Sequence, residues 1–113
     1  MFSMTYLPTV LTGLGLAANI SAAQAAPPGV HYAWQALDIN TAQCLRQAQQ
    51  ALESQGLEPI QNDAISLAGR SETVTAMFVC MENAAAVTTV MVVVASNDDA
   101  EALALREALK RAF

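Results

Sequence analysis

The chain has no lysine or arginine before Arg46, and five basic residues stand against ten acidic ones, for a formal net charge of −5. Proteins that bind nucleic acid neutralise phosphates with clustered Lys and Arg side chains, and anionic membrane surfaces attract basic patches. The charge balance therefore argues against both kinds of partner. Aromatic residues make up 5% of the chain, with a single Trp, so a stacking platform for bases or sugars is not expected.

Residues that carry enzyme or metal chemistry are also scarce. His31 is the only histidine, and no glycine-bracketed serine accompanies it, as a nucleophile elbow would require. Zinc sites need three or four Cys, His or carboxylate ligands, and no glycine-rich phosphate loop occurs. We therefore expect a non-enzymatic protein without catalytic residues, cofactor or metal. A small extracytoplasmic enzyme that uses His31 is the alternative, and it would need a cleft holding His31 near Asp38 or Glu82.

The N-terminal segment lacks basic residues but otherwise has the features of a secretory signal peptide. An apolar run over 7–20 is followed by Ala23-Gln24-Ala25, which fits an A-x-A cleavage site. The run is about 14 residues long, whereas a bilayer span takes about 20. We predict a signal peptide over 1–25, a flexible mature N-terminus over 26–30 and one small domain over 31–113. The mature protein would be periplasmic or secreted, with no stable membrane anchor after cleavage; an uncleaved anchor and an ordinary N-terminal segment are the alternatives.

The spacing of apolar residues in the mature segment predicts four strands and two helices in the order β-α-β-β-β-α. Gly56 is expected to end the first helix in the left-handed conformation, and Asp98 with Glu101 to begin the second. The fold class that follows is α+β, a two-layer sandwich of a small antiparallel sheet with two helices packed on one face. The expected elements are a strand over 30–37, a helix from Asn40 or Thr41 to Gln55, a strand over 64–68, a turn over 69–71, strands over 73–81 and 87–95 joined by a turn over 82–86, and a helix over 100–113.

Two cysteines occur in the chain, and both are expected to face the same layer. Cys44 lies on the apolar stripe of the first helix, and Cys80 shares one side of its strand with Val74, Ala76 and Phe78. Because disulfides persist in exported proteins, we predict a Cys44–Cys80 disulfide. Two reduced, buried cysteines are the alternative. A redox pair is less favoured, because the C-x-x-C spacing that activates a thiol is absent.

The other side of the predicted sheet carries a second apolar surface. Met77, Val79 and Met81 share it, and pairing of Met81 with Val87 would place Met91 beside them. Two helices cover one face of a sheet, so these four residues form the candidate interaction face. Three occupants are open: the mature N-terminus or neighbouring strands, a second copy in a homodimer, or a different protein or apolar ligand.

A soft-metal site is a further hypothesis. Cuprous ion prefers thioether and thiolate donors, which Met77, Met81 and Met91 could supply with Cys80 or His31. Cys80, however, belongs to the opposite side of its strand, so these donors converge only if the strand has a bulge. We therefore expect a protein-binding or self-associating module stabilised by one disulfide, with a copper or thiol-redox carrier as the alternative.

Overall fold

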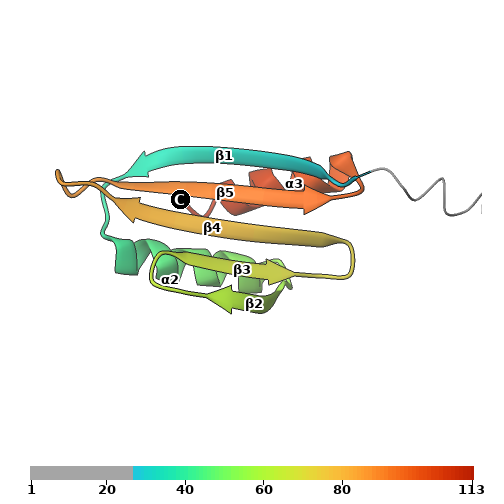
Figure 1. Ribbon diagram of the computed structural model, residues 1–113, viewed down its shortest axis with the longest axis horizontal. Helices are drawn as coiled ribbons and strands as arrows, with labels where there is room; N and C mark the ends of the chain where they lie inside the picture. The colour runs from blue at the N-terminus through green and yellow to red at the C-terminus, as the bar shows by residue number, and fades with distance from the viewer. Residues whose placement is uncertain (1–26) are drawn as a thin grey trace, which may run out of the picture.

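The computed structural model describes residues 27–113, which form a five-stranded antiparallel sheet and two helices (Figure 1). The predicted signal peptide, residues 1–25, lies outside the described residues. The strands are ordered β1-β5-β4-β3-β2 across the sheet. The elements in chain order are β1 (Gly29–Leu37), α2 (Thr41–Ser54), β2 (Glu58–Asn62), β3 (Ser66–Arg70), β4 (Val74–Glu82), β5 (Thr88–Ser96) and α3 (Asp99–Lys110).

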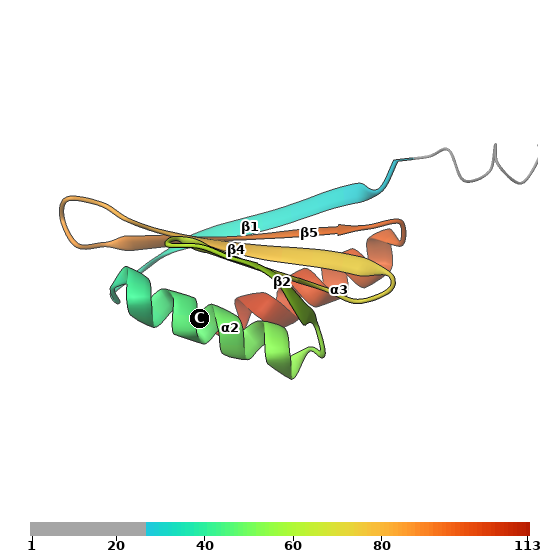
Figure 2. The ribbon, with the colours of Figure 1, turned by 60° about the horizontal axis from the view of Figure 1, so that its bottom comes forward.

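Both helices lie on the same side of the sheet, as Figure 2 shows. Helix α3 packs across β1 and β5, and α2 packs across β3 and β4. We call this side the helix face. The opposite side, which we call the open face, has no helix over it within residues 27–113 (Figure 2). The predicted α+β class and its two-layer arrangement are confirmed.

Alternation along β4 and β5 sorts their side chains between the two faces. The even-numbered residues of both strands point to the helix face, where they are buried except at the end of β4, and the odd-numbered residues point to the open face. Phe78 and Val94 are fully buried from the sheet side, and Leu109 is fully buried from α3. Valine suits such strands because its branched side chain packs well on a pleated surface. The core therefore lies between the helices and the three longest strands.

Side-chain caps fix where both helices begin. The Asn40 side chain accepts a hydrogen bond from the Gln43 N–H at 2.8 Å, while the Gln43 side chain accepts one from the Asn40 N–H at 3.1 Å. This reciprocal pair satisfies two of the free N–H groups at the start of α2. The Asp98 side chain accepts a hydrogen bond from the Glu101 N–H at 3.1 Å and caps α3, while the Asp98 N–H donates to the Ser96 hydroxyl at 3.0 Å. Gly56 has a φ of 73° and ends α2, as expected.

A disulfide ties α2 to the centre of the sheet. It joins Cys44 on α2 to Cys80 on β4, with 6.1 Å between the Cα atoms, as predicted. Both cysteines are fully buried, and no free cysteine occurs among residues 27–113. The other buried residues of α2 are Ala48, Ala51 and Leu52. Because two of these side chains are small, α2 buries little apolar surface of its own, and the covalent bond is a large part of its attachment.

Strand β2 was not predicted, and its sequence contains Pro59. Proline lacks a backbone N–H and is found in sheets chiefly on edge strands. β2 is such a strand: it pairs only with β3, and its register shifts between Pro59 and Gln61. The order is therefore β-α-β-β-β-β-α rather than β-α-β-β-β-α.

The turn predicted over 69–71 is also wrong, because Gly69 lies inside β3. Its backbone is approached closely by the segment that enters β2: a Cβ atom on Gly69 would lie 3.1 Å from the Leu57 Cβ atom. Glycine is therefore present at this position for close packing rather than for a turn. The predicted strand over 64–68 accordingly begins and ends two residues later, at Ser66 and Arg70.

The hairpin between β4 and β5 has a different register from the one expected. Met81 pairs with Thr89 rather than with Val87. The Asn83 side chain accepts hydrogen bonds from the N–H groups of Ala85 at 2.8 Å and Val87 at 3.1 Å, so the turn extends to Val87. The shift is two residues, and a shift of two leaves every side chain on its expected face. β1 likewise begins at Gly29, within the segment expected to be flexible.

The Asp63 carboxylate in the β2–β3 turn contributes to stability in a way that depends on pH. Its carboxylate accepts hydrogen bonds from the N–H groups of Ile65 at 3.0 Å and Ser66 at 2.8 Å. These bonds, that of Ile65 foremost, hold the pKa of Asp63 below its ordinary value of 3.8. Because the pKa of Asp63 is lower in the folded state, the ionised carboxylate contributes fully to stability above the unfolded-state pKa. This contribution is lost as the pH falls through the folded-state pKa.

We therefore expect Asp63→Asn to unfold at a lower temperature than the wild type near neutral pH, and the difference to shrink as the pH falls below 3.8. Circular dichroism melts between about pH 2 and 7 measure it. Glu72→Gln, in the neighbouring β3–β4 turn, is the control for loss of a negative charge. A difference between wild type and Asp63→Asn that stays constant across this range would contradict the assignment.

Candidate interaction surface

The open face is built from rows of side chains that cross β1, β5 and β4. One row contains Tyr32, Val93 and Met77, and the next contains Trp34, Met91 and Val79. The structure therefore brings together the four predicted residues Met77, Val79, Met81 and Met91 on one surface. Met81 is exposed, and the other three are half-buried because neighbours in the same layer flank them.

The most exposed apolar side chains of this face come from β1 and were not among the predicted face residues. Val30, Tyr32 and Trp34 are 61%, 62% and 65% exposed. They alternate with half-buried residues along the strand, so all three point to the open face. This alternation is visible in the sequence, but it does not reveal that β1 lies beside β5. Once the strand order is known, these residues extend the methionine and valine surface to the sheet edge.

The open face carries almost no charge. Its side chains from β1, β4 and β5 are Val30, Tyr32, Trp34, Ala36, Thr75, Met77, Val79, Met81, Thr89, Met91, Val93 and Ala95. Charged side chains reach it at one corner, where Arg70 of β3 pairs in register with Glu58 of β2. In a chain with a net charge of −5, an uncharged surface of this kind adds little electrostatic repulsion against another copy or another acidic protein.

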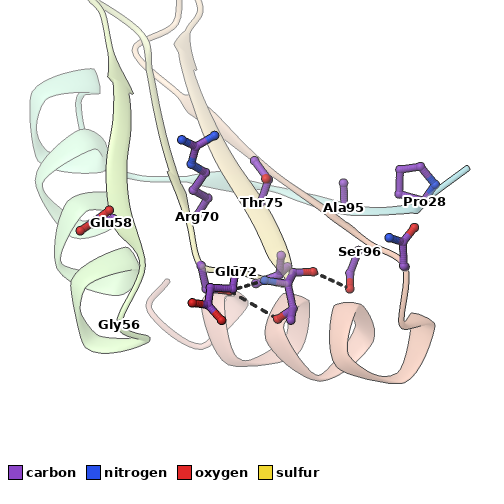
Figure 3. A pocket seen from close by; sticks show the side chains of 12 residues that line it. Pro28, Gly56, Glu58, Arg70, Glu72, Thr75, Ala95 and Ser96 are labelled. Atoms are coloured by element: carbon purple, nitrogen blue, oxygen red, sulfur yellow. Dashed lines mark hydrogen bonds between the residues drawn. The ribbon is translucent and has the colours of Figure 1, made fainter. Parts of the chain in front are cut away.

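A shallow hollow of about 860 Å³ lies at that corner, and Figure 3 shows its lining. Arg70 and Glu58 enter it from β3 and β2. The polar groups on its floor are bonded to one another: the Ser96 Oγ atom lies 2.9 Å from the Thr73 carbonyl oxygen, and the Thr73 hydroxyl donates to Glu101 at 2.8 Å. These bonds hold the β3–β4 turn against the start of α3, so the polar groups that line the hollow have a structural role.

His31 lies on the helix face and contacts the start of α3. Its Nε2 atom is 3.0 Å from the Asp99 carboxylate. Asp38 and Glu82 belong to the other end of the sheet, since they adjoin the Leu37–Thr88 end of the β1–β5 pairing. Glu82 instead accepts hydrogen bonds at 3.2 Å from the N–H and the hydroxyl of Thr41. The cleft that the enzyme alternative needs, with His31 beside Asp38 or Glu82, is therefore not present.

The sulfur atoms considered for copper are divided between the two faces. Met77, Met81 and Met91 share the open face, and Met91 is paired with Val79, between the two methionines of β4. Cys80 is buried on the helix face within the disulfide. The β4 strand keeps its regular register through this region, so no bulge places the Cys80 sulfur atom beside the methionines. His31 also points to the helix face.

Neither helix in the described part of the chain is long and apolar enough to cross a bilayer. Comparisons of the chain with protein-family models, with curated proteins and with solved structures find no match.

Proposed function

We propose that this protein is a non-enzymatic, extracytoplasmic module that binds another protein chain through the open face. The observation that carries the proposal is the apolar, nearly uncharged surface formed by β1, β5 and β4. Each of these strands has nine residues, so the surface is about 30 Å long and about 14 Å wide. Contiguous exposed apolar patches larger than a few hundred Å² are uncommon on folded monomers and mark interaction sites.

The residue types on the open face support a protein partner. Tyr, Trp and Met are enriched in protein interfaces, where a few aromatic side chains supply much of the binding energy. Tyr32 and Trp34 would act as rigid anchors. The flexible thioethers of Met77, Met81 and Met91 can adapt to a partner of irregular shape.

The extracytoplasmic location is supported by the buried Cys44–Cys80 disulfide, because reducing compartments keep thiols reduced. The predicted signal peptide over 1–25 agrees with it. Both features would be expected of a domain that matures in the periplasm or outside the cell.

A charge at the centre of the open face tests the proposal. Val79 lies between Met91 and Ser66 in register, and Val79→Lys places an ammonium group there. We expect this variant to keep its fold, since the half-buried side chain lies on the open face and a lysine ammonium there can reach solvent. We expect binding to weaken by at least about tenfold, because burying an unpaired charge is costly. Gln50→Lys adds the same charge on the exposed side of α2 and is the matched control.

The measurement is capture from an extracytoplasmic fraction with wild type, Val79→Lys and Gln50→Lys as bait, followed by titration of each captured protein in purified form. Loss of the same partner from Val79→Lys alone supports the open face. Equal affinities for the two lysine variants would place binding on another surface.

A further inference from the structure

The two edges of the sheet differ in how well they are protected against pairing with another strand. β2 has five residues, contains Glu58 and Pro59, and has an irregular register. Short length, charge, proline and bulges are the features by which sheets prevent pairing at their edges. β1 has none of them: it has nine residues, regular pairing with β5, and no Lys, Arg, Asp, Glu or Pro. Within residues 27–113 no strand pairs with the outer edge of β1, so this edge can accept a further strand.

The direction of the backbone groups in β1 follows from the sheet next to it. The Cys80 N–H donates to the Ile65 carbonyl at 2.7 Å, so the backbone of Cys80 points toward β3. Successive residues of a strand direct their N–H and C=O groups to opposite sides of the strand, so the backbone groups of Met77 are directed toward β5 and bond with those of Val93. The N–H and C=O groups of Val93 are therefore directed away from β1. Tyr32, which is paired with Val93, has its backbone groups directed toward the free edge of the sheet.

A side-chain contact agrees with this assignment. The Tyr32 carbonyl accepts a hydrogen bond at 3.4 Å from Arg106 of α3, which reaches it from beside the strand. By alternation, one N–H and one C=O from each of Val30, Tyr32, Trp34 and Ala36 face the free edge. The Arg106 bond is long, and the guanidinium also contacts Glu107 at 3.0 Å, so it can give up Tyr32 to a stronger donor.

We propose that β1 pairs with β1 of a second copy in antiparallel orientation, so that two sheets join at their edges in a two-fold symmetric dimer. This pairing rests on the proposed binding role, because it names a second copy as the partner, but it uses the strand edge rather than the open face. Pairing along the whole of Gly29–Leu37 centres the two-fold axis on Ala33. Each copy then presents the same edge to the other.

The register centred on Ala33 matches both the backbone and the side chains. It sets Tyr32 opposite the partner's Trp34, and Val30 opposite the partner's Ala36. These are the residues whose N–H and C=O groups face the edge, so every one of those groups gains a partner across the axis. Two Tyr–Trp pairs also form side by side on the open face, and cross-strand aromatic pairs stabilise antiparallel strands. Two copies of this nine-residue strand bond all of their outward N–H and C=O groups in one symmetric register, and this favours a second copy over an unrelated peptide.

Ala36→Pro tests the edge directly. The Ala36 N–H points outward, so proline removes no hydrogen bond within the sheet and is tolerated on an edge strand. In the dimer the ring lies where the partner's Val30 carbonyl would accept a bond. By sedimentation equilibrium of the purified, disulfide-bonded protein, we expect wild type to dimerise at about 100 µM and Ala36→Pro to dissociate at least tenfold more readily.

An engineered crosslink tests the register without weakening the strand. Cα atoms of a non-hydrogen-bonded antiparallel pair lie about 4.5 Å apart, within the range of a disulfide. Ala33→Cys should therefore form a covalent dimer on oxidation. Gln35→Cys, on the same strand and face, is the matched control, since its two copies would lie about 13 Å apart along the strands. Ala36→Pro in the Ala33→Cys background should remove the crosslink.

The outcomes separate this inference from the proposed function. A dimer that survives Val79→Lys but not Ala36→Pro, with the Ala33→Cys crosslink, supports edge pairing. A dimer that survives Ala36→Pro but not Val79→Lys would mean that the open faces pair, which overturns edge pairing and retains the proposed surface. A wild type that stays monomeric at about 100 µM overturns the dimer. Binding of another protein through the open face is then still tested by the capture experiment.

Discussion

Reduction of the Cys44–Cys80 disulfide should lower the free energy of unfolding by roughly 3.5–4 kcal/mol in the chain-entropy model, given the 36-residue separation of the two cysteines. For a domain of this size, that is a large fraction of a total stability of about 4–13 kcal/mol. The effect should fall most heavily on α2. Its remaining buried side chains are Ala48, Ala51 and Leu52, which bury little area against the sheet.

Urea denaturation with and without reductant measures this loss. Because both sulfur atoms are fully buried, the reduced protein should be prepared by reduction in denaturant and refolding. Cys44→Ala/Cys80→Ala is the control: reductant should not change its unfolding midpoint. If oxidised and reduced wild type unfold at the same urea concentration, the disulfide does not stabilise the fold.

Leu109→Ala should destabilise the domain by about 2–5 kcal/mol, because it leaves a cavity under the sheet. Leu109 is fully buried and is the one large side chain among the buried residues of α3, which otherwise buries Ala102. Half-buried Leu105 and Phe113 would be left to hold the helix against β1 and β5.

Leu103→Ala provides the matched control on the same helix. Leu103 is 40% exposed, and alanine has a slightly better helix propensity than leucine, so the free energy of unfolding should change by less than about 1 kcal/mol. Chemical denaturation of both variants gives the comparison. Equal losses for the two substitutions would show that α3 does not pack as described.

Local patterns in the sequence were sufficient to predict the two layers of this fold and which side chains lie between them. Alternation separated Phe78 and Cys80 from Met77 and Val79, and the Asn40 and Asp98 caps located the helix starts. The disulfide followed because helix and strand periodicity pointed both cysteines into one layer. These features depend on residues close in sequence, which is why they could be predicted.

Features that depend on distant segments could not be predicted in the same way. Pro59 obscured β2, because the sequence does not show that this strand lies at an edge, where proline is tolerated. Gly69 looked like a turn residue because its contact with Leu57 arises only after α2 and β2 are in place. Tyr32 and Trp34 alternate with their neighbours within the predicted strand over 30–37, but their place beside Met91 and Val93 depends on the β1–β5 pairing.

The unequal edges of the sheet also limit how far self-assembly can extend. Pairing of two β1 strands occupies the β1 edge of both copies, so the joined sheet has a β2 strand at each end. β2 is short, irregular and interrupted by Pro59, so it offers a poor template to a third molecule. In the proposed dimer, growth would therefore stop at two copies, and the open-ended filaments that strand addition otherwise produces would not form.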